Sequence, residues 1–102
     1  MPRRTVALIF GGKSPEHEIS VISARAVAAQ IDPQEYAVTP LYIGHDGRWH
    51  GEACSTKVIG TDLAALLRSG TPDSARARLQ EIAAEFADER FDFTAFQERT
   101  EV

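Results

Sequence analysis

The sequence lacks most features of secreted and membrane proteins. It contains one cysteine, Cys54, so it cannot form an internal disulfide and does not resemble a disulfide-stapled secreted scaffold. No apolar run approaches the roughly 20 residues of a membrane-spanning helix. The apolar run at residues 5–10 follows Arg3 and Arg4 but is too short for a signal peptide. These absences predict a cytoplasmic protein that does not bind membranes.

Excess positive charge is also absent. The chain has 11 Lys and Arg against 15 Asp and Glu, a formal net charge of -4, which argues against a nucleic-acid partner. Residues 1–30 differ, because four Lys or Arg outnumber Glu16 and Glu18 and give a local charge of +2. An anionic ligand could be accommodated there, although taken alone these charges are better explained as a solvated surface.

The length of 102 residues and the ordinary composition, with 43% hydrophobic and 25% charged residues, predict one globular domain over residues 1–102. An enzyme that closes two or three domains around its substrates is not expected to be complete in so short a chain. The short length therefore predicts either one domain of a larger enzyme or a small binding module.

Hydrophobic patterning predicts an α/β fold with a parallel sheet. The continuous apolar run at residues 5–10 is typical of a strand buried on both faces, and residues 36–43 form a second strand. Between them a helix is expected, with Ser14 as its N-cap and Pro15 at its first position. Its core-facing side is predicted from helical spacing to carry Ile19, Ile22, Ser23, Ala26 and Val27.

The rest of the chain shows turn and helix signals. Asp46-Gly47 predicts a tight hairpin turn, and residues 61–68 predict a short helix that Gly70 ends. Another helix starts near Thr71 and Pro72 and buries a stripe of Ala75, Leu79, Ile82, Ala83 and Phe86. The alternating residues 91–96 could form a third strand.

Gly11 and Gly12 do not complete a known nucleotide-binding loop. Gly12-Lys13-Ser14 resembles the end of a Walker A loop, but Ala7 occupies the position of its first glycine, and G-x-G-x-x-G also fails. A strand, two glycines and a helix N-terminus still place backbone donors at the carboxyl edge of a sheet, where open α/β sheets bind ligands. A binding site and a simple connector turn remain equally open.

The string FGGKSPEHEISVISA at residues 10–24 resembles the N-terminal signature of D-alanine–D-alanine ligases. The string LYIGHDGRW at residues 41–49 is similar to the second strand and hairpin of that family. The resemblance implies a small Rossmann-like, three-layer α/β domain of the pre-ATP-grasp type, here incomplete at its C-terminus, that forms one wall of the substrate site.

The same resemblance implies an ATP-dependent reaction. The carboxylate of one D-alanine is phosphorylated to an acyl phosphate, and the amine of a second D-alanine attacks it to give the dipeptide used for peptidoglycan precursors. ATP and Mg²⁺ are then the cofactors of the full-length enzyme, D-alanine is the small-molecule substrate, and a homodimer is the expected assembly. Neither cofactor is expected to bind tightly to this chain alone.

Four residues are the predicted substrate-binding set. Glu16 matches the family glutamate that holds the ammonium group of the first D-alanine, and His17 follows it in the motif. Gly11 and Gly12 are expected to turn the chain tightly and let it approach the ligand. Without the resemblance, Glu16 would be interpreted as a carboxylate that compensates the helix dipole.

Neighbouring polar residues are given structural roles. Glu18 is expected to serve the first helical turn or an ion pair, Ser20 and Ser23 to cap or pack, and Trp49 to pack. His45, His50 and Cys54 supply three zinc-type ligands without a fourth, so no metal site is predicted.

The sequence departs from the family after residue 93. Residues 94–102 do not continue the family's third-strand pattern, and no ATP-grasp region is present, so no catalytic residue is assigned and the chain alone is predicted to be inactive. Two alternatives stay open. One is a standalone, non-catalytic ligand-binding or interaction domain, and the other is the N-terminal domain of a related ligase with D-lactate as its second substrate.

Overall fold

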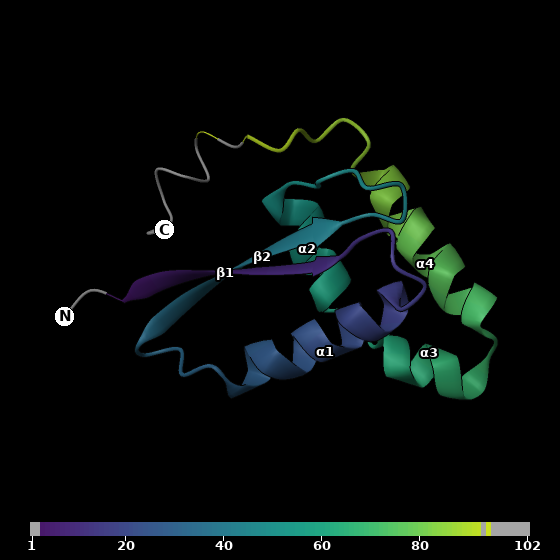
Figure 1. The fold of residues 1–102 in the computed structure, drawn as a ribbon, viewed down its shortest axis with the longest axis horizontal. Coiled ribbons are helices and arrows are strands. Elements are labelled where there is room, and N and C mark those ends of the chain that lie inside the picture. The colour runs from purple at the N-terminus through teal and green to yellow at the C-terminus, as the bar shows by residue number, and fades with distance from the viewer. Residues whose placement is uncertain (1–2, 93, 95–102) are drawn as a thin grey trace.

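A computed structural model describes residues 3–92 and 94, and it is built on two parallel strands (Figure 1). Strand β1 (Arg4–Gly11) pairs with β2 (Tyr36–Ile43) over their full lengths, with Arg4 opposite Tyr36 and Gly11 opposite Ile43. Helix α1 (His17–Gln30) connects the two strands. The predicted α/β class with parallel strands is therefore confirmed.

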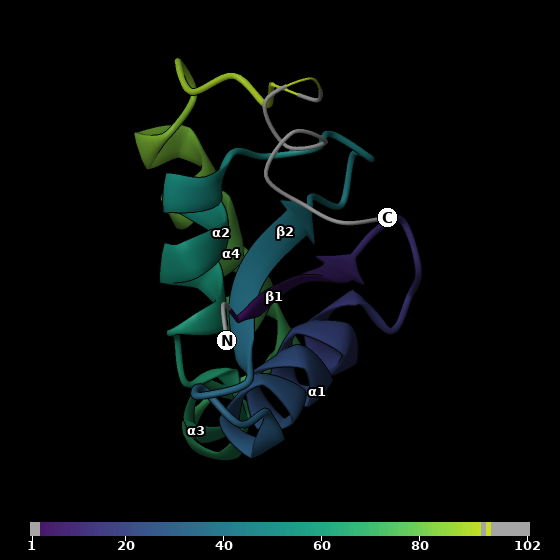
Figure 2. The ribbon, with the colours of Figure 1, turned by 90° about the vertical axis from the view of Figure 1, so that its left-hand side faces the viewer.

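Three further helices follow β2: α2 (Glu52–Ile59), α3 (Leu63–Ser69) and α4 (Pro72–Glu85). Helix α2 contacts β2, α1 and α4, while α3 lies against α1 and α4 (Figure 2). The predicted helices at residues 61–68 and from Thr71 onward are confirmed. Thr71 and Ser74 form a reciprocal capping box at the start of α4, which explains why that helix begins there.

The core gathers buried side chains from β1, β2 and helices α1 to α4. Phe10 and Tyr42, opposite each other in the sheet, have ring centroids 5.6 Å apart. Around them lie Val21, Ala24, Cys54, Val58, Leu63, Ala75, Leu79 and Ile82. Alternate side chains of a strand point to opposite faces, and Ile9 is 53% exposed. The prediction that β1 is buried on both faces is therefore wrong at Ile9, whose side chain is exposed.

Helix α1 begins later, and faces the core differently, than the sequence predicts. Ser14 does not cap the helix: its hydroxyl accepts from the Glu16 N–H and its carbonyl from the His17 N–H, which forms a turn before α1. The buried residues of α1 are His17, Val21 and Ala24. The predicted face is right at Ile22, which packs against the core. It is wrong at Ile19 and Val27, which are about half exposed because α1 turns His17, Val21 and Ala24 inward instead.

Helix α2 is not predicted by the sequence. Its segment is short and rich in Cys, Ser, Thr, Val and Ile, which are weak helix formers. Two distant contacts stabilise it. The Ser55 hydroxyl donates to the Gly51 carbonyl and accepts from the Tyr42 N–H, and the Glu89 carboxylate accepts from the N–H groups of Ala53 and Cys54 at 3.2 Å each.

The hairpin turn after β2 is confirmed. The Gly44 N–H donates to the Arg48 carbonyl, Gly47 has a φ of +83°, and Trp49 forms an antiparallel bridge with Ile43. Trp49 packs against Phe91, as expected for a packing residue. The predicted third strand at residues 91–96 lies largely outside the described residues, and residues 91 and 92 are not in a strand.

No helix within residues 3–92 is both long enough and apolar enough to cross a lipid bilayer.

The cap that Glu89 provides to α2 can be tested by substitution. Glu89→Ala leaves the Ala53 and Cys54 N–H groups without their acceptor, so the free energy of unfolding should fall by about 1 kcal/mol. Urea denaturation followed by far-UV circular dichroism measures the change. Glu81→Ala, which removes only an exposed ion pair with Arg78, is the matched control and should cost less than about 0.5 kcal/mol. Equal losses in both variants would contradict the cap.

Candidate functional site

The end of β1 is a tight turn made by Gly11 and Gly12. Both have positive φ angles, +94° and +97°, which favour glycine. The Gly11 N–H donates to the Ser20 hydroxyl at 3.0 Å, and the Gly12 N–H donates to the Ile43 carbonyl at 2.8 Å. A Cβ on Gly11 would lie 2.1 Å from the Ile43 carbonyl oxygen, whereas a Cβ on Gly12 would meet no atom within 4 Å. The turn is therefore closed toward β2 and α1 and open on the side of Gly12.

His17 holds this turn from inside the protein. Its side chain is fully buried, with Nδ1 2.6 Å from the Gly12 carbonyl oxygen and Nε2 2.7 Å from the Tyr42 hydroxyl. A carbonyl can only accept, so Nδ1 carries the proton and donates, and Nε2 accepts from Tyr42. Both ring nitrogens are used inside the protein, which makes His17 a positioning residue behind Gly12 instead of a group that faces the ligand.

The electrostatics keep His17 neutral. Burial lowers its pKa, an effect that outweighs the hydrogen bond to the Gly12 carbonyl, and the neighbouring His45 lowers it further. The His45 ring stacks on that of His17 with centroids 3.5 Å apart. His45 also places Nε2 2.9 Å from Glu18 Oε1. Partial burial raises the pKa of Glu18, but the hydrogen bond from His45 brings it below the ordinary value. Glu18 lies in the first turn of α1 and its carboxylate binds His45, which agrees with the structural role expected for it.

Glu16 is the exposed member of the predicted set. It is the N-cap residue of α1, and its side chain makes no cap hydrogen bond. Within residues 3–92 its carboxylate forms no hydrogen bond or ion pair. Glu16 therefore presents a free carboxylate at the start of α1, four residues after the Gly12 end of the turn. Such a group can accept a charge-assisted hydrogen bond from an ammonium group.

The glycine turn does not fit a phosphate chain, and the described residues do not fit a metal ion. The N–H groups of Gly11 and Gly12 already donate to protein acceptors, so they cannot wrap a phosphate. No group of three or more His, Cys, Asp or Glu in the described part of the chain could hold a metal. Cys54 is fully buried, and burial raises the pKa of its thiol to about 11, which removes it as a nucleophile at neutral pH.

Comparison with known proteins now decides the family. A family model for the D-ala D-ala ligase N-terminus matches residues 5–98. The chain belongs to the D-alanine–D-alanine ligase family. The D-alanine–D-alanine ligases of Chlorobaculum tepidum and Chlorobaculum parvum align with the whole chain and are 60% and 53% identical to it over 102 residues. The chain spans 28% of the length of each of these curated relatives.

A solved structure gives the same result for the fold. The D-alanine–D-alanine ligase of Coxiella burnetii is 26% identical and superimposes with a TM-score of 0.53, over 70% of this chain and 20% of that chain. The resemblance seen in residues 10–24 is therefore confirmed at the level of family and fold.

Tyr42 is the site residue that the sequence analysis missed. The sequence did indicate it: a tyrosine near the carboxyl end of a buried strand needs a hydrogen-bond partner for its hydroxyl, and here that partner is His17.

The two glycines of the turn should differ in their tolerance of a side chain. Gly12→Ala adds only backbone strain, about 1–3 kcal/mol, because its Cβ meets open space. Gly11→Ala adds the collision with the Ile43 carbonyl, so its loss in the free energy of unfolding should be clearly larger. Urea denaturation of the two variants measures the difference, with Gly12→Ala as the matched control. Equal stability of the two variants would rule out the close approach.

Acid should destabilise the fold through its buried imidazoles. The pKa of His17 in the folded chain lies below 6.5, the unfolded value, so only the unfolded state gains a proton as pH falls through 6.5. Burial also lowers the pKa of His50, which acts in the same direction. The free energy of unfolding should therefore be fully present above pH 6.5 and fall below it. Titration of the His17 imidazole by NMR checks the cause, and a midpoint at or above 6.5 would disprove it.

Proposed function

We propose that residues 1–102 form the N-terminal domain of an ATP-dependent D-alanine–D-alanine ligase of the ATP-grasp type, which makes the dipeptide for peptidoglycan precursors. In this proposal the domain binds the first D-alanine. The observation that carries it is the unpaired carboxylate of Glu16 beside the glycine turn, within the family's matched segment. The ligases of the two Chlorobaculum species, which match over the whole chain, support the same activity.

The residues of this chain would act by binding and orienting. The Glu16 carboxylate accepts a hydrogen bond from the ammonium group of D-alanine and neutralises its charge. Gly12 has open space where a side chain would stand, so the substrate can lie close to the backbone. His17 and Tyr42 act indirectly, since their hydrogen bonds fix the Gly12 carbonyl and with it the start of α1. Orientation of this kind lowers the entropy that the reaction must lose in its transition state.

ATP and Mg²⁺ are not assigned to the described residues. The glycine turn has no free N–H pair for a phosphate, and no three-ligand metal group is present within residues 3–92. The relatives extend well beyond the matched region, since the chain spans 28% of their length. We therefore expect the nucleotide and its metal to bind outside this domain, and the chain alone to form no dipeptide.

A chimeric ligase tests the role of Glu16. Residues 1–92 of this chain replace the matching part of the Chlorobaculum tepidum ligase, to which the chain is 60% identical. The chimera should form D-alanyl-D-alanine from ATP, Mg²⁺ and D-alanine. Glu16→Gln keeps the size of the side chain but removes its charge, so kcat/KM for D-alanine should fall at least about tenfold, as expected for a lost charge-assisted hydrogen bond.

Glu35→Gln is the matched control, because Glu35 is an exposed carboxylate just before the start of β2, at the other end of the sheet. Its kcat/KM should equal that of the unsubstituted chimera. Circular dichroism establishes that each protein is folded. A folded chimera without ligase activity would contradict the proposed domain, whereas equal kcat/KM in Glu16→Gln and Glu35→Gln would contradict the role of Glu16 alone.

A further inference from the structure

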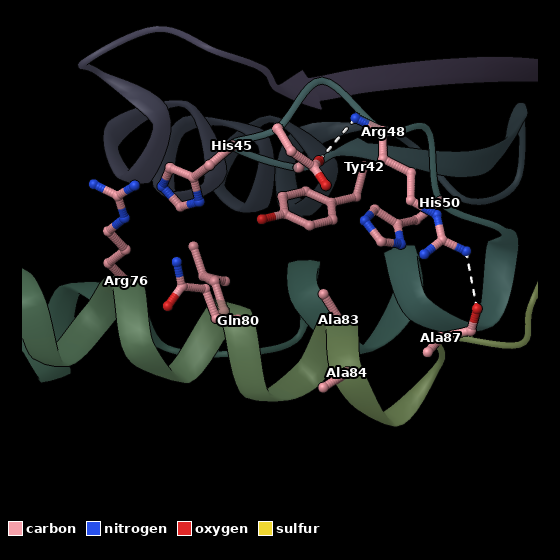
Figure 3. A pocket seen from close by; sticks show the side chains of 12 residues that line it. Tyr42, His45, Arg48, His50, Arg76, Gln80, Ala83, Ala84 and Ala87 are labelled. Carbon is pink, nitrogen blue, oxygen red and sulfur yellow. Dashed lines mark hydrogen bonds between the residues drawn. The ribbon is translucent and has the colours of Figure 1, made fainter.

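A second feature of the structure is a cavity of about 440 Å³ between the hairpin loop (residues 44–50) and α4. Figure 3 shows Arg76 rising from α4 beside His45 at one end, and His50 and Arg48 at the other. Ala83, Ala84 and Ala87 line the α4 side with small side chains. His45 lines the cavity and stacks on His17, whereas Glu16 is not a lining residue, so the cavity is separate from the Glu16 carboxylate.

His50 is a buried imidazole whose ring has no hydrogen-bond partner within residues 3–92. It is only 4% exposed, and its ring stacks on that of Tyr42 with centroids 5.4 Å apart. Neither ring nitrogen forms a hydrogen bond with any residue in the described part of the chain. An unsatisfied buried polar group of this kind costs about 1–3 kcal/mol, so such groups in native proteins usually have a ligand or water partner.

The backbone beside His50 leaves room for such a partner. Gly44 lines the same cavity, and a Cβ added to it would lie 3.2 Å from His50 Nε2 and 2.9 Å from an Asp46 carboxylate oxygen. Glycine at this position therefore keeps one imidazole nitrogen open to a small molecule.

The charges that line the cavity favour an anion. Arg76 forms no ion pair or hydrogen bond within residues 3–92, so its guanidinium is free. Arg48 is held in place because its Nη2 donates to the carbonyls of Ala87 and Glu89 at 3.0 and 3.3 Å, which leaves further N–H groups unused. Asp46 is the single acid among the lining residues, and its Oδ1 accepts from the Arg48 backbone N–H at 2.9 Å.

We propose that this cavity binds a small oxyanion, a phosphate or a carboxylate, that accepts hydrogen bonds from Arg48 and from the imidazole of His50, at the same end of the cavity (Figure 3). Guanidinium groups are suited to both anions, because their planar N–H groups match two oxygen atoms of either. The cavity is within the size range of small-molecule sites. Tyr42 and His45 form its inner wall and contact His17 on the other side, so the site borders the proposed D-alanine site without sharing Glu16.

NMR titration of the full chain tests the proposal. The imidazole signals of His50 are followed while inorganic phosphate, or in a separate arm succinate, is added at constant ionic strength set with sodium chloride. A saturable shift with at least one of the two probes is expected, and the tighter one identifies the class of anion. Linear, non-saturating shifts with both probes would overturn the proposal.

Two arginine variants separate a built site from general charge. Arg48→Gln removes the guanidinium beside His50, and the Kd of the bound probe should rise at least about tenfold in a variant that circular dichroism shows to be folded. Arg78→Gln makes the same change on α4 at a residue that pairs with Glu81 and does not line the cavity, so its Kd should not change. Equal weakening in both variants would mean that the anion responds only to net charge and would overturn the proposal.

Discussion

The hydrogen bonds of the buried His17 imidazole join the three parts of the structure on which the candidate site depends. Nδ1–H holds the Gly12 carbonyl, Nε2 receives the Tyr42 hydroxyl, and the residue itself begins α1. A glycine turn with positive φ angles has no conformational preference strong enough to fix itself. The imidazole therefore supplies the constraint, and in its neutral form it donates through Nδ1 and accepts through Nε2, so both ring nitrogens are satisfied.

The same residue explains which features the sequence could predict. Strands β1 and β2, the Asp46-Gly47 hairpin and the start of α4 follow from local patterns, namely apolar runs, a turn pair and a threonine followed by a proline. The buried face of α1 does not, since hydrophobic periodicity treats a histidine as polar and places Ile19 inward instead. Helix α2 was missed for a related reason: its acceptor Glu89 lies more than 30 residues away, and no local signal reveals that contact.

The candidate site shows a similar division. The glycines and the helix start were visible as a turn at a strand end, but physical arguments alone gave Glu16 no role beyond compensation of the helix dipole. Only the resemblance of residues 10–24 to the ligases singled it out, and its binding role stays a prediction. The structure adds what neither could supply, namely that His17 is turned inward and Glu16 outward although they are adjacent in the sequence.

The contrast between the buried His17 and the exposed Glu16 explains how a surface carboxylate can serve a binding site. An ion pair at the protein surface contributes roughly 0–1 kcal/mol, so Glu16 alone would hold an ammonium group weakly. Its value in the proposed function lies in placement, because α1 begins at a point fixed by His17, Ser20 and the glycine turn, so the backbone that carries the carboxylate need not rearrange when a substrate binds. A weakly binding but well-placed group is what a wall of a larger site requires, since affinity can then come from groups that close over the substrate and strengthen each contact by excluding water.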